Sequence, residues 1–569
     1  MTTSATGIPD VKTWGVEFQG ATLHIDSDVV PRGDILFLDV ETDERDNFVG
    51  IALTTDGTQV YYYTEFRQDV RDAIAQSITC GHNIKADLKW LINWGVPHNV
   101  VTNAKYDTAL MSYVLDSTRE SHGLKDLAKT ELQMFYPSYK EMVGKGKTKV
   151  TLDQQPVETV ANYCGNDVLA TFRLYHYLNA KLSDVQKKYL DTIEVPTMWS
   201  LCDMERRGVL VNADYVTDLD TRFNLESMLH SERIKRVCRS EINLNSPKQV
   251  RERILGRCGI KAESTAAETL KNFKNVPLIK SLLRYRELEK LTGTYTDVLR
   301  EKSGGQSTYR LHADFNQLVT NTGRLSSSRP NLQNIPTRTK DGSLMREVFI
   351  AKPGHIFIDA DYSQIEPRVM AHMSGDKALI KIFTDGLDLY DTISAYVGCT
   401  RDIAKILWLA LAYNAGAFRI SQIAKISVLQ AQEFLSKMRN LFPEFFYWRE
   451  LTIRKTEQNH TVRTLYGRDI PIGPEDSGKG PNYIIQGSAA EIMKQALIRT
   501  RLYGQVITVH DEILYEVPWE YWQGKARTLK QLLESDMPVS VPIKVDIGTG
   551  QTWGEAKKKS NKLPEGFFK

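Results

Sequence analysis

The sequence predicts a multidomain protein of mixed α/β and α+β class, and three patterns carry this prediction. Between residues 34 and 183, short apolar runs alternate with segments of helical spacing, which is typical of a layered α/β domain. From about 184 to 310 the chain is mostly helical and rich in charge. Beyond 311, strand-like runs return on both sides of a helical block at roughly 376–460, so distant pieces should complete one sheet.

The individual elements follow from apolar spacing and from helix caps. Ser246 before Pro247 predicts a helix start, with serine as N-cap and proline at the first helical position. The two strands expected last in the chain flank a short turn and therefore form a hairpin. Expected strands lie at 35–38, 48–53, 60–63, 348–350, 356–359, 506–509 and 513–517, and expected helices at 67–78, 84–94 and 278–300.

Composition fits a large globular protein and selects no function. The 569 residues are 41% hydrophobic and 25% charged, which predicts three or four structural units at about 150 residues each. A net charge of +3 does not by itself point to nucleic acid. The three lysines at 557–559 are explained equally well by a solvated tail and by phosphate contacts.

Cysteine spacing and apolar runs predict a cytoplasmic protein without membrane segments. Six cysteines are scattered without Cys-x-x-Cys spacing, which argues against zinc and against a disulfide framework. The N-terminus lacks the basic and apolar regions of a signal peptide. The longest wholly apolar run, at 406–413, is far shorter than the roughly 20 residues of a membrane helix.

A first set of acids follows the first strand. Asp39 and Glu41 are two residues apart, so both carboxylates can face the same side of a strand. Asp87 lies in a helical segment, as do Tyr163 and Asp167, which are four apart and share one helical face. Four acids in one domain repel each other unless cations neutralise them. Magnesium held by carboxylates is the usual solution for attack on a phosphodiester.

In this order and spacing, the acids resemble the DEDD-type 3′→5′ exonucleases that have tyrosine in the last motif. The segment 122–128 (HGLKDLA) is also similar to one found in these domains. The resemblance implies a ribonuclease H-like exonuclease domain over residues 1–183. In that domain Asp39, Glu41, Asp87 and Asp167 would hold two metals, and Tyr163 would help to orient the attacking water.

A second set of acids stands at two distant strand ends. The run 357–361 (FIDAD) ends in acids, and Pro367 suits the first turn of a following helix. Far along the chain, His510, Asp511 and Glu512 lie between two apolar runs, which predicts a hairpin whose tip presents acids to a cleft. Two separate surface turns would give the same pattern.

The sequences of these two segments resemble motifs A and C of family A DNA polymerases, the family of the bacterial DNA polymerase I large fragment. Further similar segments are 290–295 (KLTGTY), 322–327 (TGRLSS), 330–336 (PNLQNIP) and 483–490 (YIIQGSAA). The resemblance implies a right-hand polymerase over 184–569. Its helical thumb would cover about 200–310, its antiparallel palm sheet about 311–375 and 480–569, and its helical fingers about 376–479.

The resemblance also assigns roles. Asp361 and Asp511 would hold two Mg²⁺ ions, which Mn²⁺ can replace, with the Tyr362 carbonyl as a further ligand and Glu512 nearby. One metal would lower the pKa of the primer 3′-hydroxyl and the other would hold the triphosphate. Glu366 would exclude a ribose 2′-hydroxyl. Gln364 would also contact the nucleotide, and the expected DNA contacts are Arg324, Gln333, Asn334, Arg468, Gln486 and His510.

Four regularly spaced residues predict a nucleotide-binding helix. Arg401, Lys405, Leu409 and Tyr413 recur every fourth residue and therefore share one helical face. An amphipathic helix would show this pattern too, but the stripe is similar to the fingers helix of family A, which binds the triphosphate and base. Two positions depart from that family: Leu409 replaces the usual aromatic residue, and Asn414 replaces the usual glycine. We hypothesise slower incorporation and altered rejection of dideoxynucleotides.

The sequence therefore predicts a DNA-directed DNA polymerase with a proofreading exonuclease. The expected partners are primer-template DNA and dNTPs, with the protein acting as a monomer beside replisome proteins such as a helicase or single-strand-binding protein. Alternatives are a single-subunit RNA polymerase, a nuclease with a silent polymerase half, and a non-catalytic DNA-binding scaffold. A chain that begins with the exonuclease and has no 5′-nuclease domain resembles phage or viral replicative members, which would act in the host cytoplasm.

Overall fold

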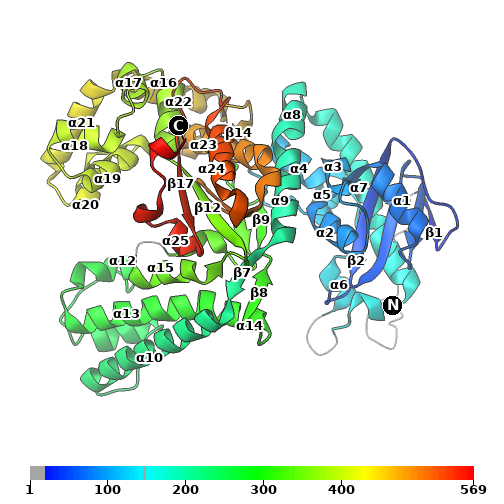
Figure 1. Cartoon of the computed structure of the whole chain (residues 1–569), viewed down its shortest axis with the longest axis horizontal. Helices are drawn as coiled ribbons and strands as arrows, with labels where there is room; N and C mark the ends of the chain where they lie inside the picture. The colour runs from blue at the N-terminus through cyan, green and yellow to red at the C-terminus, as the bar shows by residue number, and fades with distance from the viewer. Residues whose placement is uncertain (1–19, 145–148, 337–338, 569) are drawn as a thin grey trace.

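The structure is a computed structural model that describes residues 20–144, 149–336 and 339–568. The N-terminal unit lies at the right of Figure 1, and the remaining chain forms a central sheet with two helical lobes at the left. The expected α/β and α+β architecture is confirmed. Among the described residues, no helix combines the length and apolar character needed to cross a membrane.

The N-terminal unit is built on a six-stranded mixed sheet. Its strand order is β1-β4-β3-β2-β5-β6, with β2, β3 and β4 antiparallel and the outer pairs parallel. The strands expected at 35–38, 48–53 and 60–63 and both expected helices are confirmed. The strands are Thr22–Ile25, Ile35–Thr42, Phe48–Thr54, Gln59–Tyr63, Ile78–Gly81 and Ala104–Asp107; helices α1 to α7 are Gln68–Gln76, Lys85–Asn93, Val100–Asn103, Thr108–Leu115, Leu124–Leu132, Tyr139–Val143 and Val157–Lys181.

A four-stranded antiparallel sheet forms the centre of the rest of the chain. Its order is β15-β16-β12-β17, so strand β12 lies between two strands that come much later in the sequence. This arrangement confirms that one sheet is completed by distant pieces. The strands are β12 (His355–Tyr362), β15 (Gln505–Val509), β16 (Glu512–Pro518) and β17 (Val545–Gly550), and helices α23 (Gly480–Arg499), α24 (Trp522–Glu534) and α25 (Trp553–Ala556) accompany them.

The lower lobe in Figure 1 is helical and contains the long antiparallel pair α10 and α13. Ser246 caps the following helix, as expected, because its hydroxyl accepts a hydrogen bond from the Gln249 N–H. The helix expected at 278–300 is interrupted by a π-helical segment, Thr292–Thr296. The helices of this lobe are α10 (Ala213–Cys238), α11 (Pro247–Gln249), α12 (Ala267–Leu270), α13 (Pro277–Leu291), α14 (Asp297–Ser303) and α15 (Lys340–Glu347). Helices α8 (Asp184–Tyr189) and α9 (Val195–Arg207) lie between the N-terminal unit and the central sheet (Figure 1).

Two small sheets join this lobe to the centre. The strand expected at 348–350 is present, but it pairs in the order β11-β7-β8 and not with the central sheet. The strands are β7 (Val209–Asn212), β8 (Thr308–Leu311) and β11 (Phe349–Ile350), with the separate pair β9 (Asp314–Asn316) and β10 (Ser326–Ser328).

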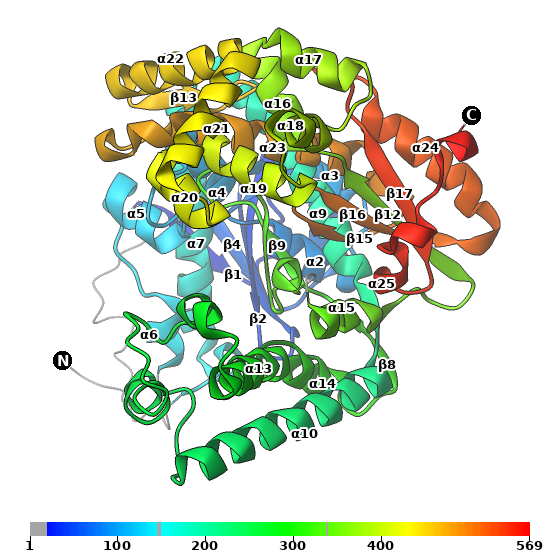
Figure 2. The same ribbon diagram turned by 90° about the vertical axis from the view of Figure 1, so that its left-hand side faces the viewer.

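The upper lobe packs helices around Trp408, which is fully buried against the rings of Phe442 and Phe445. Figure 2 shows this lobe opposite the α10–α13 pair, with the central sheet between them. Its elements are α16 (Ile365–Ser374), α17 (Lys377–Thr384), α18 (Leu389–Val397), α19 (Arg401–Ala412), α20 (Ala417–Ala424), α21 (Val428–Leu441), α22 (Pro443–Asn459), β13 (Thr461–Arg463) and β14 (Asp469–Pro471).

Candidate active sites

The structure brings the first set of acids together at the N-terminal sheet. Strand β2 presents Asp39 and Glu41, helix α2 presents Asp87, and helix α7 presents Asp167. Glu41, Asp87 and Asp167 are buried. Tyr163, one turn before Asp167 on α7, is buried beside them. All five residues of this expected site therefore converge.

Mutual repulsion marks this cluster as a cation site. Burial and the charge of Asp167 raise the pKa of Asp39 to about 8. Burial and neighbouring carboxylates also raise the pKa of Glu41 and of Asp87. Bound divalent cations would reverse these shifts, because they favour the charged carboxylates. The oxygen-rich ligand set fits magnesium.

Two further residues that the sequence interpretation assigned no role also reach the cluster. The Lys125 ammonium contacts Asp167 and lies 4.1 Å from the centre of the Tyr163 ring. The buried Cys164 thiol lies 3.4 Å from a carboxylate oxygen of Asp39. Lys125 stands in the segment 122–128 that resembles exonuclease domains, which was the available signal.

The second set of acids meets at the end of the central sheet. Asp361, at the end of β12, lies opposite Glu512 on β16. The Tyr362 N–H donates a 2.9 Å hydrogen bond to the Asp511 carbonyl, which holds the hairpin tip against β12. Burial and the charge of Asp361 raise the pKa of Asp511 to about 7, so this pair also favours a bound cation.

Glu512, which follows Asp511 in the sequence, is already paired by other residues. Its carboxylate accepts a 2.5 Å hydrogen bond from the Trp553 indole and lies 3.4 Å from the Arg346 guanidinium. The charges of Lys557 and Arg346 lower the pKa of Glu512 to about 2 against the opposing effect of burial. Glu512 is therefore held as an anion next to Asp361 and Asp511, the candidate metal ligands.

A cavity of about 480 Å³ opens over Asp361 and Asp511. Helix α19 supplies Lys405 and Leu409 to its lining, so these two members of the expected stripe share one face, whereas Tyr413 is the residue just after the helix and does not line the cavity. The same cavity is lined by Arg324, Gln333, Tyr362, Gln364, Glu366 and His510. Acids from strands and a cation from a helix thus face each other across one space.

Arg401 lies outside this cavity wall and is held by an acid that the sequence interpretation missed. Asp388 accepts a 2.6 Å hydrogen bond from the Arg401 guanidinium and a 2.8 Å hydrogen bond from the Gln364 amide. Asp388 precedes helix α18 and also caps it through the Asp391 N–H. One carboxylate therefore connects two of the residues expected to bind nucleotide.

Glu366 of helix α16 connects Arg324 with the end of helix α19. Its two carboxylate oxygens accept hydrogen bonds from Arg324 and from the Tyr413 hydroxyl. Gln486 also hydrogen-bonds to Tyr413. The residues expected to contact sugar, base and primer end are therefore one connected set.

The expected DNA contact by Arg468 is wrong in this structure. Arg468 is 1% exposed, and its guanidinium donates to the Tyr113 hydroxyl at 2.7 Å and to the Asn321 carbonyl at 2.9 Å. The bond to Tyr113 connects it to the N-terminal unit, and the bond to Asn321 holds it to the segment between β9 and β10. Asn334 is exposed and does not line the cavity.

Asn414 has a simple backbone explanation. Its φ is +62°, a left-handed conformation that glycine adopts freely and that asparagine tolerates better than most residues. The side chain amide lies 3.5 Å from where a Cβ on Gly478 would be. The substitution at the usual glycine position is therefore compatible with the turn after α19.

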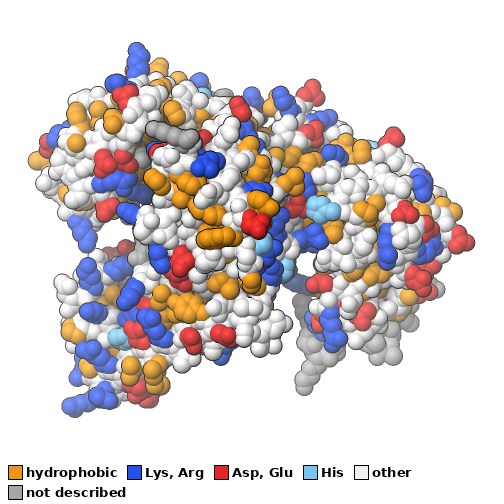
Figure 3. Space-filling model, in the orientation of Figure 1, with side chains coloured by type: hydrophobic (Ala, Val, Ile, Leu, Met, Phe, Trp, Pro, Cys, Tyr) orange, Lys and Arg blue, Asp and Glu red, His pale blue; other side chains and the backbone are white. Residues whose placement is uncertain are grey.

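A basic groove of about 1050 Å³ lies on the lower lobe. Figure 3 shows Lys and Arg side chains on the edge of this lobe that faces the hollow below the upper lobe. The cations lining the groove are Arg233, Lys271, Lys274, Lys280, Arg284, Arg286 and Lys290. Such a surface suits a phosphate backbone.

Residues 213–555 match the family model described as DNA polymerase family A. The chain belongs to this family. Residues 45–183 match the model described as 3′-5′ exonuclease. Glu366, Lys405, Asp361 and Asp511 lie within the polymerase match. Asp87, Tyr163 and Asp167 lie within the exonuclease match.

Known relatives agree with this assignment. DNA polymerase I of Chloroflexus aurantiacus is 33% identical over 524 residues, 83% of this chain and 54% of the relative. DNA polymerase I of Pseudomonas aeruginosa is 32% identical over 523 residues, 84% of this chain and 57% of the relative. The chain thus spans about half the length of these curated relatives. The solved POL domain of Pol1 from M. smegmatis, in complex with DNA primer-template and dNTP, is 25% identical with a TM-score of 0.81, covering 92% of this chain and 97% of that chain.

Proposed function

We propose that this family A member is a DNA-directed DNA polymerase that extends a primer 3′ end with dNTPs and removes misplaced nucleotides with its 3′→5′ exonuclease. The observation that carries the proposal is the cavity over Asp361 and Asp511, with Lys405 and Leu409 on the opposite wall. The M. smegmatis relative was solved with primer-template and dNTP, which supports the same substrates here.

Asp361 and Asp511 would hold magnesium at the polymerase site, and Asp39, Glu41, Asp87 and Asp167 would hold it at the exonuclease site. When bound, these ions supply activation of the attacking oxygen and neutralisation of charge on the phosphates. Manganese has the same oxygen preference and would replace magnesium. A monomeric state and contacts with replisome proteins stay predictions.

The protein's own residues position the reactants. Lys405 would contact the triphosphate and Tyr413 the base, while Glu366, which lines the cavity and binds Tyr413, would exclude a ribose 2′-hydroxyl. In the exonuclease site, Tyr163 and Lys125 lie over Asp167 and would orient the attacking water and the scissile phosphate. Neither set reads base sequence.

Gel-resolved reactions on a labelled primer-template test both activities. With Mg²⁺ and dNTPs we expect elongation, and without dNTPs shortening from the 3′ end. Asp39→Ala should abolish shortening and keep elongation, whereas Asp511→Ala should do the reverse, so each variant is the control for the other. Loss of both activities from either change would contradict the assignment of two separate sites.

A further inference from the structure

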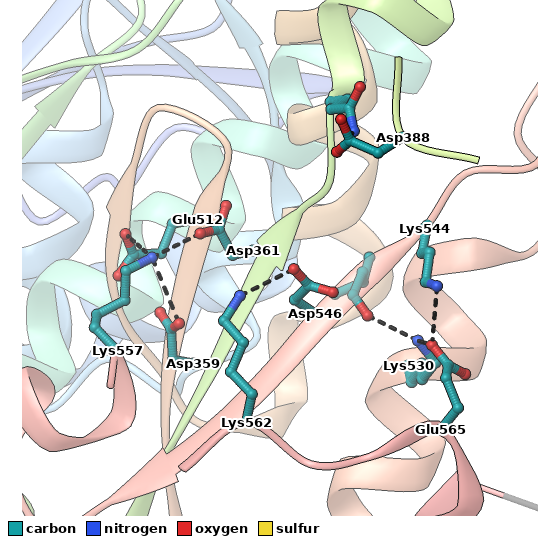
Figure 4. Close-up of polar contacts among 12 residues, drawn as sticks. Asp359, Asp361, Asp388, Glu512, Lys530, Lys544, Asp546, Lys557, Lys562 and Glu565 are labelled. Carbon is teal, nitrogen blue, oxygen red and sulfur yellow. Dashed lines mark hydrogen bonds and ion pairs between the residues drawn. The ribbon is translucent and has the colours of Figure 1, made fainter. Parts of the chain in front are cut away.

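Lys557 places its ammonium among three carboxylates of the polymerase site (Figure 4). The nitrogen lies 2.7 Å from Asp361, 3.0 Å from Glu512 and 3.5 Å from Asp359. The residue directly follows α25, and its side chain is 24% exposed. One of the three lysines at 557–559 is therefore part of the site and not of a solvated tail.

Asp359 is the unexplained member of this group. It lies two residues before Asp361 on β12, on the same face of the strand, and is 0% exposed. Among the described residues, neither of its oxygens has a hydrogen-bond donor, and its close neighbour is another carboxylate, that of Glu512. A buried carboxylate without hydrogen bonds is unfavourable unless a cation pairs with it. Its ion-pair partner here is Lys557.

Lys557 is shared unequally among the three acids. Glu512 also has the Trp553 indole and Arg346, so its charge is compensated without the lysine. Asp361 has the shortest contact, although the proposed function requires its oxygens for a divalent cation. A shift of roughly 1 Å or less would bring the ammonium from 3.5 Å into normal hydrogen-bond distance of Asp359.

We propose that Lys557 is a positioning residue that exchanges partners, leaving Asp361 when a divalent cation binds there and pairing instead with Asp359. This inference rests on the proposed function of the polymerase site. A divalent cation and an ammonium repel each other and compete for the same Asp361 oxygen. Asp359 lowers the cost of that exchange because it retains the displaced charge in the site.

Asp359 is unsuited to be a metal ligand itself. It lines neither the cavity over Asp361 nor the adjoining cavity of about 550 Å³, which Lys557, Glu512 and Asp511 line. Asp359 therefore affects metal binding through Lys557. This predicts that the effect of removing Asp359 depends on the presence of Lys557.

Binding of Mn²⁺ alone, followed by electron paramagnetic resonance without DNA or dNTP, tests the coupling. The background carries Asp39→Ala and Glu41→Ala, which remove exonuclease ligands. We expect Lys557→Met to tighten Mn²⁺ binding at least fivefold, because the competing charge is gone and the stem remains. Asp359→Asn should weaken it at least fivefold. In the Lys557→Met background, Asp359→Asn should change it less than twofold.

Three results would overturn the inference. Unchanged or weaker Mn²⁺ binding in Lys557→Met would show that the lysine does not compete. An unchanged affinity in Asp359→Asn would show that Asp359 does not retain the lysine. An equal loss from Asp359→Asn in both backgrounds would show that Asp359 acts on the metal directly.

Controls separate these results from folding and from the proposed function. Lys558→Met removes the neighbouring lysine, which pairs with Glu347 at 3.1 Å, and should leave Mn²⁺ affinity unchanged. Lys557→Gln gives a second, polar replacement should the methionine variant unfold. If the parent protein extends no primer, the proposed function fails whatever the Mn²⁺ titrations show; if it extends primers without the coupling, only this inference fails.

Discussion

Replacing Arg468 by methionine should weaken the junction between the two units and leave DNA binding intact. The guanidinium is buried and donates to Tyr113 of helix α4 and to the Asn321 carbonyl. Methionine fills part of the volume but donates no hydrogen bond, so both acceptors lose this donor. The Tyr113 hydroxyl keeps its bond to the Thr320 carbonyl, and the Asn321 carbonyl keeps its bond from the Ser117 hydroxyl, so neither group is left unpaired. The loss is that of two hydrogen bonds from a charged donor, about 1.5–3 kcal/mol each and about 3–6 kcal/mol together.

Chemical denaturation followed by circular dichroism measures this loss. Arg468→Lys keeps the charge but reaches fewer acceptors with its single ammonium, so it should lose less stability than Arg468→Met. Both variants should retain secondary structure at low denaturant concentration.

The salt dependence of primer-template affinity tests whether Arg468 contacts DNA. Removing a cation that contacts phosphate lowers the slope of log affinity against log salt by about 1. Lys290→Gln, in the exposed basic groove, should show this change, and Arg468→Met should not. A reduced slope with unchanged stability in Arg468→Met would refute the structural role and restore the DNA contact.

Four other changes address single contacts. Leu409→Phe should speed single-nucleotide addition severalfold by restoring ring contact with the sugar; an unchanged or slower rate in rapid quench would contradict this. Glu366→Ala should raise ribonucleotide incorporation about tenfold or more, measured as the ratio of NTP to dNTP addition rates. Asp388→Asn should free Arg401 and tighten dNTP binding up to about fivefold, because such partly exposed ion pairs contribute about 0.2–1 kcal/mol. Weaker dNTP binding in single-turnover titrations would contradict this and indicate that Asp388 positions Arg401 for nucleotide binding. Lys125→Met should slow primer degradation at unchanged extension, and equal losses in both assays would indicate folding damage.

The carboxylates that follow strands could be predicted because local sequence decides their placement. Asp39 and Glu41 share a strand face by alternation alone, and the apolar runs around Asp511 specify its hairpin. The stripe on α19 follows from helical spacing in the same way. In these places a few neighbouring residues determine the geometry.

The contacts that could not be predicted depend on packing between distant segments. Lys557 meets Asp359 because α25 packs against β12, which lies far earlier in the chain. Arg468 lies in the turn between two short strands, and its buried contacts come from Tyr113 of the N-terminal unit and from the Asn321 carbonyl, both far from it in the sequence. The same reason explains why the strand at 349–350 was expected in the wrong sheet. Its partner β7 also lies far earlier in the sequence.

The junction between the units limits how the proposed primer end could reach both acid clusters. Helix α2 carries Asp87 toward the exonuclease cluster, while its Lys85 and Lys89 bind Glu205 of α9 at 2.5 and 2.7 Å. Glu205 is 2% exposed, so separating the units would leave a buried carboxylate without its cations. Breaking such a buried pair costs about 3–5 kcal/mol, and Arg468 adds to this. The two acid clusters are therefore fixed relative to each other, so the proposed function requires the DNA end to move between them.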